Sequence, residues 1–231
     1  MITDKNGVVI LNKPEGLSSF LAVKIVKRCT GVKKAGHMGT LDPLATGVLV
    51  VGVNKGTKLF DKYLKSPKQY YVEYEFGYET NTLDREGEII NRNLETNIKL
   101  EDVVNASKKF LGKYLQTPPV FSAKKINGKR ACDLAREGKV VEVPAKEVEL
   151  FAVNDITEKQ KNVFSMIIDC SSGFYVRSLG RDLAKELSTF ATTLCIKRTK
   201  CCGFDIASAQ SLEEIKEGKG KIIEVEEGTI W

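Results

Sequence analysis

The sequence predicts an α+β fold with a mostly antiparallel, mixed sheet and flanking helices. From residue 68 onward, strand patterns are separated by helical ones without the regular strand–helix alternation of a parallel sheet. Apolar residues make up 42% of the 231 residues and charged residues 29%, which is typical of a globular protein and excludes a disordered or fibrous one. This length suits one large domain or two small ones.

In the first third of the chain, short apolar segments surround one amphipathic helix. The run 7–12 is apolar and ends before Pro14, so it predicts a buried strand. Ser18 or Ser19 should cap a helix that Gly31 ends. The apolar face of this helix should consist of Leu21, Ala22, Ile25, Val26 and Cys29. The polar, glycine-rich stretch that follows predicts a loop over 31–46, then a strand over 47–53 and a short helix over 57–64.

Beyond residue 68, alternating side chains predict strands, and apolar residues at helical spacing, such as Leu179, Leu183 and Leu187, predict helices. The strands are expected over 70–78, 140–143, 147–156, 163–170 and 192–198. The helices are expected over 102–110, 129–137, 177–187 and 208–217. The polar stretch 79–87 predicts a turn, and two prolines keep 116–122 extended.

Composition and spacing exclude several other classes of protein. The longest apolar stretch, residues 48–51, is far shorter than the ~20 residues of a membrane span. No apolar segment follows a basic start at the N-terminus, so we expect no secretion signal and a soluble cytoplasmic protein with reduced thiols. The six cysteines show no C-x-x-C spacing and His37 is the only histidine, which argues against a zinc site.

Positive charge is concentrated in the N-terminal part of the chain. Residues 1–65 hold eleven Lys and Arg against four Asp and Glu, a net charge of +7, whereas residues 66–231 carry −1. This asymmetry favours a polyanionic partner, with nucleic acid as the first candidate. A basic face that is merely solvated is the alternative.

The loop over 33–47 holds a lone carboxylate, Asp42, which is the only acid between Glu15 and Asp61. Its apolar neighbours Leu41 and Leu44 would partly remove it from water. A poorly solvated carboxylate in a basic stretch is a candidate nucleophile or general base. The alternative is structural, because Asp-Pro dipeptides commonly begin turns.

The segment AGHMGTLDPLATGVLVV around Asp42 resembles the catalytic motif of the pseudouridine synthase family, in its bacterial tRNA pseudouridine synthase B branch. Further segments resemble family motifs in the family's order: GVVILNKPEGLSS, KQYYVEYEFGYETNTLDREGEI, QTPPVFSAKKINGKRACDLAREG, CSSGFYVRSLGRDLA and IKRTKCCGF. The resemblance implies a pseudouridine synthase fold over 1–206, with a thumb-like insertion at about 112–145. It leaves 207–231 as a short tail without a complete RNA-binding PUA module.

The resemblance also implies the reaction. A uridine in RNA is isomerised to pseudouridine: its N1–C1′ glycosidic bond breaks, the uracil rotates, and C5 bonds to C1′. Asp42 is the implied catalytic residue, and no cofactor or metal is required. One carboxylate suffices because nothing is hydrolysed, whereas hydrolytic glycosidases typically use two. Attack of Asp42 on C1′, addition to C6 and removal of a sugar proton are three open routes.

Further site residues follow from the same resemblance. The substrate would be contacted by His37, Tyr70, Tyr175, Arg177 and Ile196. Arg177 would pair with the Asp42 carboxylate and keep it ionised. Lys13 and Asp84 would support the site. The RNA backbone would be contacted by Lys33, Lys34, Lys124, Lys125, Lys129 and Arg130. Without the resemblance, each of these is an ordinary turn, core or surface residue.

The resemblance implies a substrate as well: the T-arm stem-loop of tRNA with its uridine-55, bound by a monomer without a membrane partner. RNA loops are read through their shape and splayed bases, which suits a base-flipping enzyme. Two alternatives are a tRNA-binding folding helper with weak catalysis and a pseudouridine synthase for another RNA site.

Overall fold

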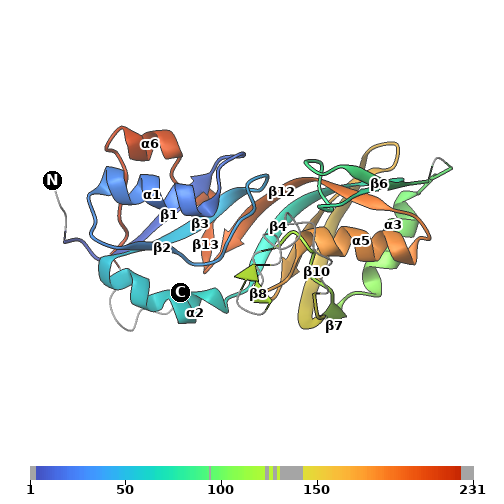
Figure 1. The fold of residues 1–231 in the computed structure, drawn as a ribbon, viewed down its shortest axis with the longest axis horizontal. Coiled ribbons are helices and arrows are strands. Elements are labelled where there is room, and N and C mark those ends of the chain that lie inside the picture. The colour runs from blue at the N-terminus through green and yellow to red at the C-terminus, as the bar shows by residue number, and fades with distance from the viewer. Residues whose placement is uncertain (1–3, 94, 123–124, 127–128, 131–142, 225–231) are drawn as a thin grey trace. The chain divides into compact units, whose positions relative to one another are not determined.

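The structure is a computed structural model, and it describes residues 4–93, 95–122, 125–126, 129–130 and 143–224 of the chain. Strands and helices follow one another irregularly (Figure 1), and most strand pairs are antiparallel. The predicted α+β class is therefore confirmed. The chain divides into two compact units: unit 1 is Met1–Tyr71 with Ile196–Trp231, and unit 2 is Val72–Cys195.

Unit 1 is built around a strand that is buried on both faces. This strand is β3 (Thr46–Val53), and its residues 48–51 have no exposed surface. β1 (Gly7–Lys13) pairs with β3 antiparallel along its whole length, and β2 (Ala35–His37) pairs with the far end of β3. The last part of β12 (Ala191–Cys201) runs parallel to the start of β3. A continuous apolar run is what a strand with two covered faces requires.

Helix α1 (Ser19–Thr30) covers one face of these strands (Figure 1). The Ser18 side chain caps it by accepting a hydrogen bond from the Leu21 amide, and Gly31 ends it in the left-handed conformation. α6 (Leu212–Lys216) lies beside α1, and α2 (Phe60–Leu64) lies on the opposite side of the strands. Unit 1 also contains η1 (Asn54–Leu59), β13 (Phe204–Asp205) and η2 (Ile206–Ser208), together with the first residues of the longer strand β4 (Lys68–Phe76).

The segment after η2 binds the outer edge of β1. The Asn12 amide donates to the Gln210 carbonyl and the Gln210 amide donates to the Ile10 carbonyl, each at 2.8 Å. Further along, the Val8 amide donates to the Ile223 carbonyl at 2.9 Å. These bonds occupy edge groups of β1 that would otherwise be open to another strand.

Unit 2 holds strands in the order β12–β4–β11–β10–β7. The last three are β11 (Val163–Cys170), β10 (Lys146–Gln160) and β7 (Gly112–Gln116). Two small hairpins accompany them, β5 (Tyr78–Thr80) with β6 (Ile89–Arg92) and β8 (Lys125–Ile126) with β9 (Lys129–Arg130).

Helices α3 (Leu100–Lys108) and α5 (Val176–Glu186) contact each other in unit 2. α5 approaches β4 closely because residue 180 is glycine: a Cβ there would lie 2.6 Å from the ring of Tyr74. The buried Tyr74 hydroxyl donates to the Val176 carbonyl at 2.8 Å and so fixes the start of α5. None of the helices in the described parts of the chain is long and apolar enough to cross a membrane.

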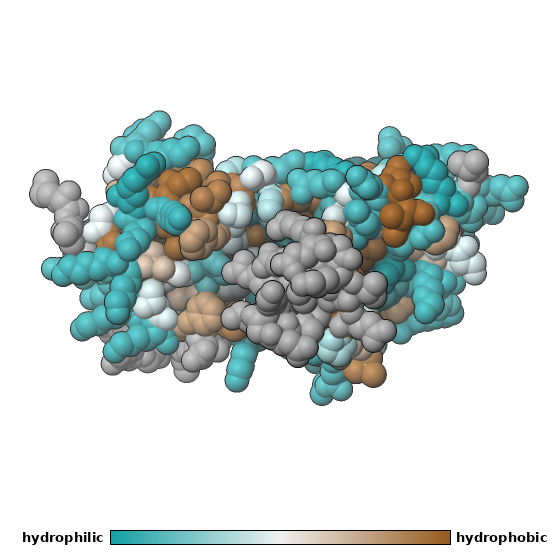
Figure 2. All heavy atoms as spheres, viewed as in Figure 1, coloured by the Kyte–Doolittle hydropathy of each residue, from teal (hydrophilic) through white to brown (hydrophobic). Residues whose placement is uncertain are grey.

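Most predicted elements are confirmed within a few residues, and the strand over 163–170 coincides with β11. The loop predicted over 31–46 is partly wrong because it contains β2, whose three residues, Ala35, Gly36 and His37, are too few to show an alternating pattern. The predicted buried face of α1 is also partly wrong: Leu21 is 47% exposed, and Val23 is buried instead. Figure 2 shows apolar side chains exposed over α1.

Three helix predictions need correction. The helix over 57–64 begins as η1, so only its second half is α-helical. The helix over 208–217 is shorter, because Ser211 and Glu214 form a capping box that starts α6 at residue 212. The helix over 129–137 begins in β9, and its residues from 131 on lie outside the described part of the chain, as do 140–142 of the strand predicted over 140–143.

Candidate active site

Asp42 lies in the loop between β2 and β3, where it is half-buried. The Ala45 amide donates to the Asp42 carbonyl at 3.1 Å, so the turn expected of an Asp-Pro dipeptide is present. Gly39 and Gly47 bound the loop with φ values of 116° and 101°, a region that favours glycine. The turn bond is made by backbone atoms, so a chemical role for the Asp42 carboxylate is compatible with it.

The buried ammonium of Lys13 binds one side of this loop. Lys13 has no exposed surface, and its Nζ donates to the carbonyls of Pro14 (2.8 Å), Leu17 (2.6 Å) and Pro43 (3.2 Å). A buried ammonium is tolerated only when its donors are satisfied, so these carbonyls and the cation depend on one another. Lys13 thus binds the residue after Asp42, and its role as a supporting residue of the site stays a prediction.

Ser19, the first residue of α1, binds the residue before Asp42. Its Oγ accepts a hydrogen bond from the Leu41 amide and donates one to the Leu41 carbonyl, both at 2.8 Å. Both bonds are buried, which makes them costly to leave unmade. Helix α1 therefore anchors the loop through its first turn.

Arg198 of β12 binds the beginning of the loop. It is 1% exposed, and its guanidinium donates to the carbonyls of Val48 (2.8 Å), Gly39 (3.1 Å) and Thr40 (3.4 Å). Glycine at position 47 permits this approach, because a Cβ there would lie 2.2 Å from the Arg198 carbonyl oxygen. Lys13, Ser19 and Arg198 together hold the loop on both sides of Asp42.

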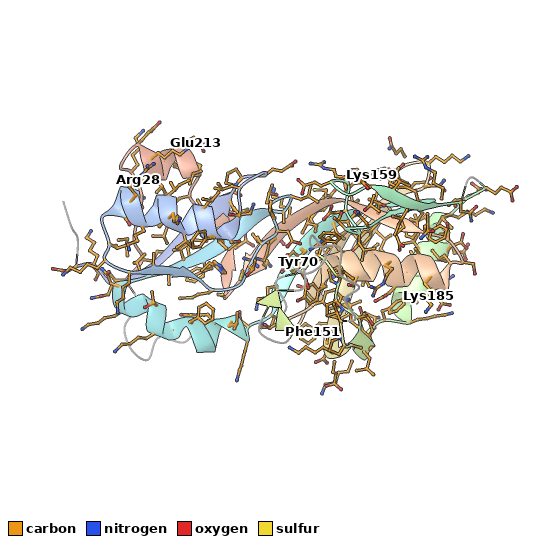
Figure 3. The ribbon with its side chains drawn as sticks, in the orientation of Figure 1. Arg28, Tyr70, Phe151, Lys159, Lys185 and Glu213 are labelled. Atoms are coloured by element: carbon orange, nitrogen blue, oxygen red, sulfur yellow. The ribbon has the colours of Figure 1, made fainter. Side chains whose placement is uncertain are left out.

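Three predicted substrate-contacting residues lie in the same unit as this loop. Tyr70, labelled in Figure 3, is buried on β4, and its hydroxyl lies beside the guanidinium of Arg198. Ile196 is buried on β12, two residues before Arg198 and so on the same face of the strand. His37 ends β2, and its Nδ1 is buried without a hydrogen-bond partner among the described residues. Burial and the nearby charge of Arg198 lower the pKa of His37 below its usual 6.5.

Arg177 and Asp84 form a buried ion pair in unit 2. Arg177 Nη1 lies 3.2 Å from Asp84 Oδ2, and both side chains are less than a tenth exposed. The guanidinium also donates to the carbonyls of Thr82 (2.8 Å) and Phe121 (3.0 Å). Arg177 is therefore no exposed helix-start arginine. The pairing of Arg177 with Asp42 would join the two units and stays a prediction.

Tyr175 precedes α5 and is held by a side chain that the sequence analysis did not single out. The buried amide of Gln116 donates to the Tyr175 carbonyl at 3.1 Å and accepts from the Tyr175 amide at 2.8 Å. This pair of bonds fixes the backbone from which the Tyr175 ring extends.

Of the six residues predicted to contact the RNA backbone, all but Lys124 lie within the described part of the chain. Lys33 and Lys34 are exposed, and Lys33 forms an exposed ion pair with Asp4 at 3.1 Å. The backbones of Lys125, Lys129 and Arg130 lie in the β8–β9 hairpin, whereas Lys124 lies outside the described residues. Their contact with RNA stays a prediction.

Ser19, Gln116 and Arg198 are the site residues that the sequence analysis missed. A signal existed for Arg198, because strand alternation places it on the same face as the apolar Ile196 and opposite the exposed Lys197. Within the described residues, no group of three or more His, Cys, Asp or Glu side chains could hold a metal ion.

The chain is similar to known proteins along most of its length. A family model described as TruB family pseudouridylate synthase (N terminal domain) matches residues 27–176. A tRNA pseudouridine synthase B of Caldanaerobacter subterraneus subsp. tengcongensis is 37% identical over 217 residues, which cover 94% of this chain and 76% of that protein. Proteins of the same name from Mesoplasma florum and Ureaplasma urealyticum are each 40% identical, over 93% of this chain and over 75% and 94% of their own lengths.

Two solved structures share the fold. A chain in the crystal structure of a Cbf5-Nop10-Gar1 complex has a TM-score of 0.71 at 21% identity, over 94% of this chain and 60% of that chain. A chain in the structure of an H/ACA RNP bound to a substrate RNA containing 2'-deoxyuridine has a TM-score of 0.67 at 21% identity, over 91% and 52%. This chain thus spans little more than half the length of either, and the likeness shows the fold alone.

The Arg177–Asp84 pair generates a prediction about stability. Asp84→Ala leaves a buried guanidinium without its carboxylate, and breaking such a pair costs about 3–5 kcal/mol of unfolding free energy. Glu147→Ala is the matched control, because its ion pair with Lys113 is 65% exposed on both sides and worth less than about 1 kcal/mol. Urea unfolding followed by circular dichroism measures both. Equal midpoints for the two variants would contradict the account.

Proposed function

Because the chain belongs to the TruB family of pseudouridylate synthases, we propose that it isomerises uridine to pseudouridine in tRNA. In this reaction the N1–C1′ bond breaks, the uracil rotates within the site, C5 bonds to C1′, and the C5 proton is released while N1 gains one. Atoms and electrons balance within the substrate, so the proposed reaction needs neither a redox partner nor a cofactor.

Asp42 is the proposed catalytic residue. The observation that carries this assignment is the immobilised loop, whose backbone is bound on both sides of Asp42 by Lys13, Ser19 and Arg198. A catalytic group must be held close to its productive position, because small displacements cost large factors in rate. Attack on C1′, addition to C6 and removal of a sugar proton all require such a fixed carboxylate.

The remaining site residues have proposed roles in holding the uridine outside its RNA stack. Extrusion of a base costs a few kcal/mol, and each stacking contact between a base and an aromatic side chain contributes ~1–3 kcal/mol that offsets this cost. Tyr70 would stack on the extruded uracil, with Tyr175 and Ile196 lining its pocket. His37 would occupy the space that the base leaves, and its lowered pKa keeps it uncharged near neutral pH. Arg177 would pair with Asp42.

The proposed substrate is uridine-55 in the T-arm stem-loop of tRNA. Support comes from the name that the related proteins carry and from the net charge of +7 over residues 1–65. We further propose that the protein acts as a monomer in the cytoplasm, where tRNA is modified. Its catalytic domain would comprise residues 1–206 with the thumb-like insertion at about 112–145.

The direct test of this proposal is turnover on an unmodified T-arm stem-loop beside Asp42→Asn. The wild type should form pseudouridine, and the variant should form none while binding RNA within about tenfold of the wild type, because Asp42 supports chemistry rather than phosphate contacts. Chemical detection of pseudouridine and filter binding measure the two quantities. Tight binding by an inactive wild type would favour the folding helper, and product on another RNA alone would favour a different target site.

Salt dependence tests the proposed RNA backbone contacts. The logarithm of the binding constant should fall linearly with the logarithm of salt concentration, since each phosphate contact releases counterions. Lys34→Met should reduce the steepness of this slope by about the amount that one phosphate contact contributes. The exposed Lys159 (Figure 3) is not among the residues proposed to contact RNA, so Lys159→Met serves as the control and should leave the slope unchanged. A slope near zero would exclude binding through a basic surface.

A further inference from the structure

Arg198 is a buried cation that contacts both the Asp42 loop and Tyr70. Its guanidinium donates to the carbonyls of Gly39, Thr40 and Val48 and lies beside the Tyr70 hydroxyl. These groups belong to different parts of unit 1: the loop, the start of β3, and β4.

The partners of Arg198 are unusual for a buried cation. Such cations are ordinarily paired with a carboxylate, because desolvation of the charge is costly. Arg198 is surrounded instead by backbone carbonyls, the thiols of Cys201 and Cys202, and the phenol of Tyr70. The loop itself therefore supplies oxygens that keep the guanidinium satisfied. If the loop moved away, the carbonyls and the cation would lose their partners together.

We propose that Arg198 is a positioning residue, which sets the Asp42 loop and Tyr70 in one fixed arrangement for the isomerisation. This inference rests on the proposed function and extends it to a residue that does not itself touch the substrate. The planar guanidinium presents several donors in a rigid fork, and three of its nitrogens are used in different directions. A lysine has one nitrogen at the end of a flexible stem and cannot keep all three carbonyl oxygens in place.

The position of Arg198 is itself fixed by the strands. Residue 198 pairs with Gly47 in the parallel β12–β3 ladder, and glycine there allows the two backbones to approach closely. Lys13 and Ser19 hold the opposite side of Asp42 through Pro43 and Leu41.

The test compares Arg198→Lys and Arg198→Gln with Lys200→Met, which removes an exposed cation from the same strand. The rate constant is measured in a single turnover of T-arm RNA with excess protein, below the unfolding temperature of each variant. Arg198→Lys should slow the reaction by ~10–100-fold, as expected of a misplaced catalytic group, with RNA affinity within about threefold of the wild type. Lys200→Met should leave the rate unchanged.

A second readout separates positioning from a general structural role. In a double-mutant cycle with Tyr70→Phe, the rate losses should be less than multiplicative, because both changes remove the same Arg198–Tyr70 contact. His37 is the only histidine, so its resonance can be followed alone: Arg198→Gln should raise its titration midpoint and Lys200→Met should not. Multiplicative losses would overturn the proposal.

Other outcomes are equally decisive. A wild-type rate in Arg198→Lys, or a loss explained entirely by weaker RNA binding, would show that Arg198 does not position the site. Unfolding of both Arg198 variants even with RNA bound would assign the residue to the fold instead and overturn the proposal. An inactive wild type would overturn the proposed function. An active wild type with equally active Arg198 variants would instead overturn only the proposed role of Arg198.

Discussion

The carbonyl oxygens of the Asp42 loop are bound by side chains that are buried with them, and the strands and helix α1 of unit 1 hold these side chains in position. Lys13 and Arg198 are cations with almost no exposed surface, and Ser19 binds both backbone groups of Leu41. Each buried donor needs its acceptor and each buried carbonyl needs its donor. The loop consequently has one conformation in which all are satisfied, and any other leaves charge unpaired in an apolar surrounding.

The strands explain how these donors reach the loop. Lys13 ends β1, Ser19 begins α1, and Arg198 lies on β12, so three elements around β3 each contribute one side chain. Unit 2 also contains a buried cation bound by backbone carbonyls, because the guanidinium of Arg177 donates to two carbonyls as well as to the Asp84 carboxylate. In both units a buried cation fixes an irregular segment by binding its backbone carbonyls.

Much of this fold could be predicted because its signals are local. The apolar run of β3, the alternation of β11 and the serine cap of α1 are all visible within a few residues. Asp42 could be singled out from its motif. The partners of buried charges could not, because they lie far apart in the sequence: Arg198 contacts Gly39 across 159 positions. A basic run such as 197–200 is ordinarily solvated, and only its register beside β3 places one of its cations inside.

The central claim is that the Asp42 loop is held in one conformation before any RNA binds. Hydrogen exchange of the Leu41 amide in the RNA-free protein measures this most directly, because that amide donates to the buried Ser19 hydroxyl and lies next to Asp42. We expect its protection to be comparable to that of the amides in the buried strand β3. Exchange at the rate of an unprotected, exposed loop would contradict the account, because the loop would then be ordered by the substrate rather than by the fold.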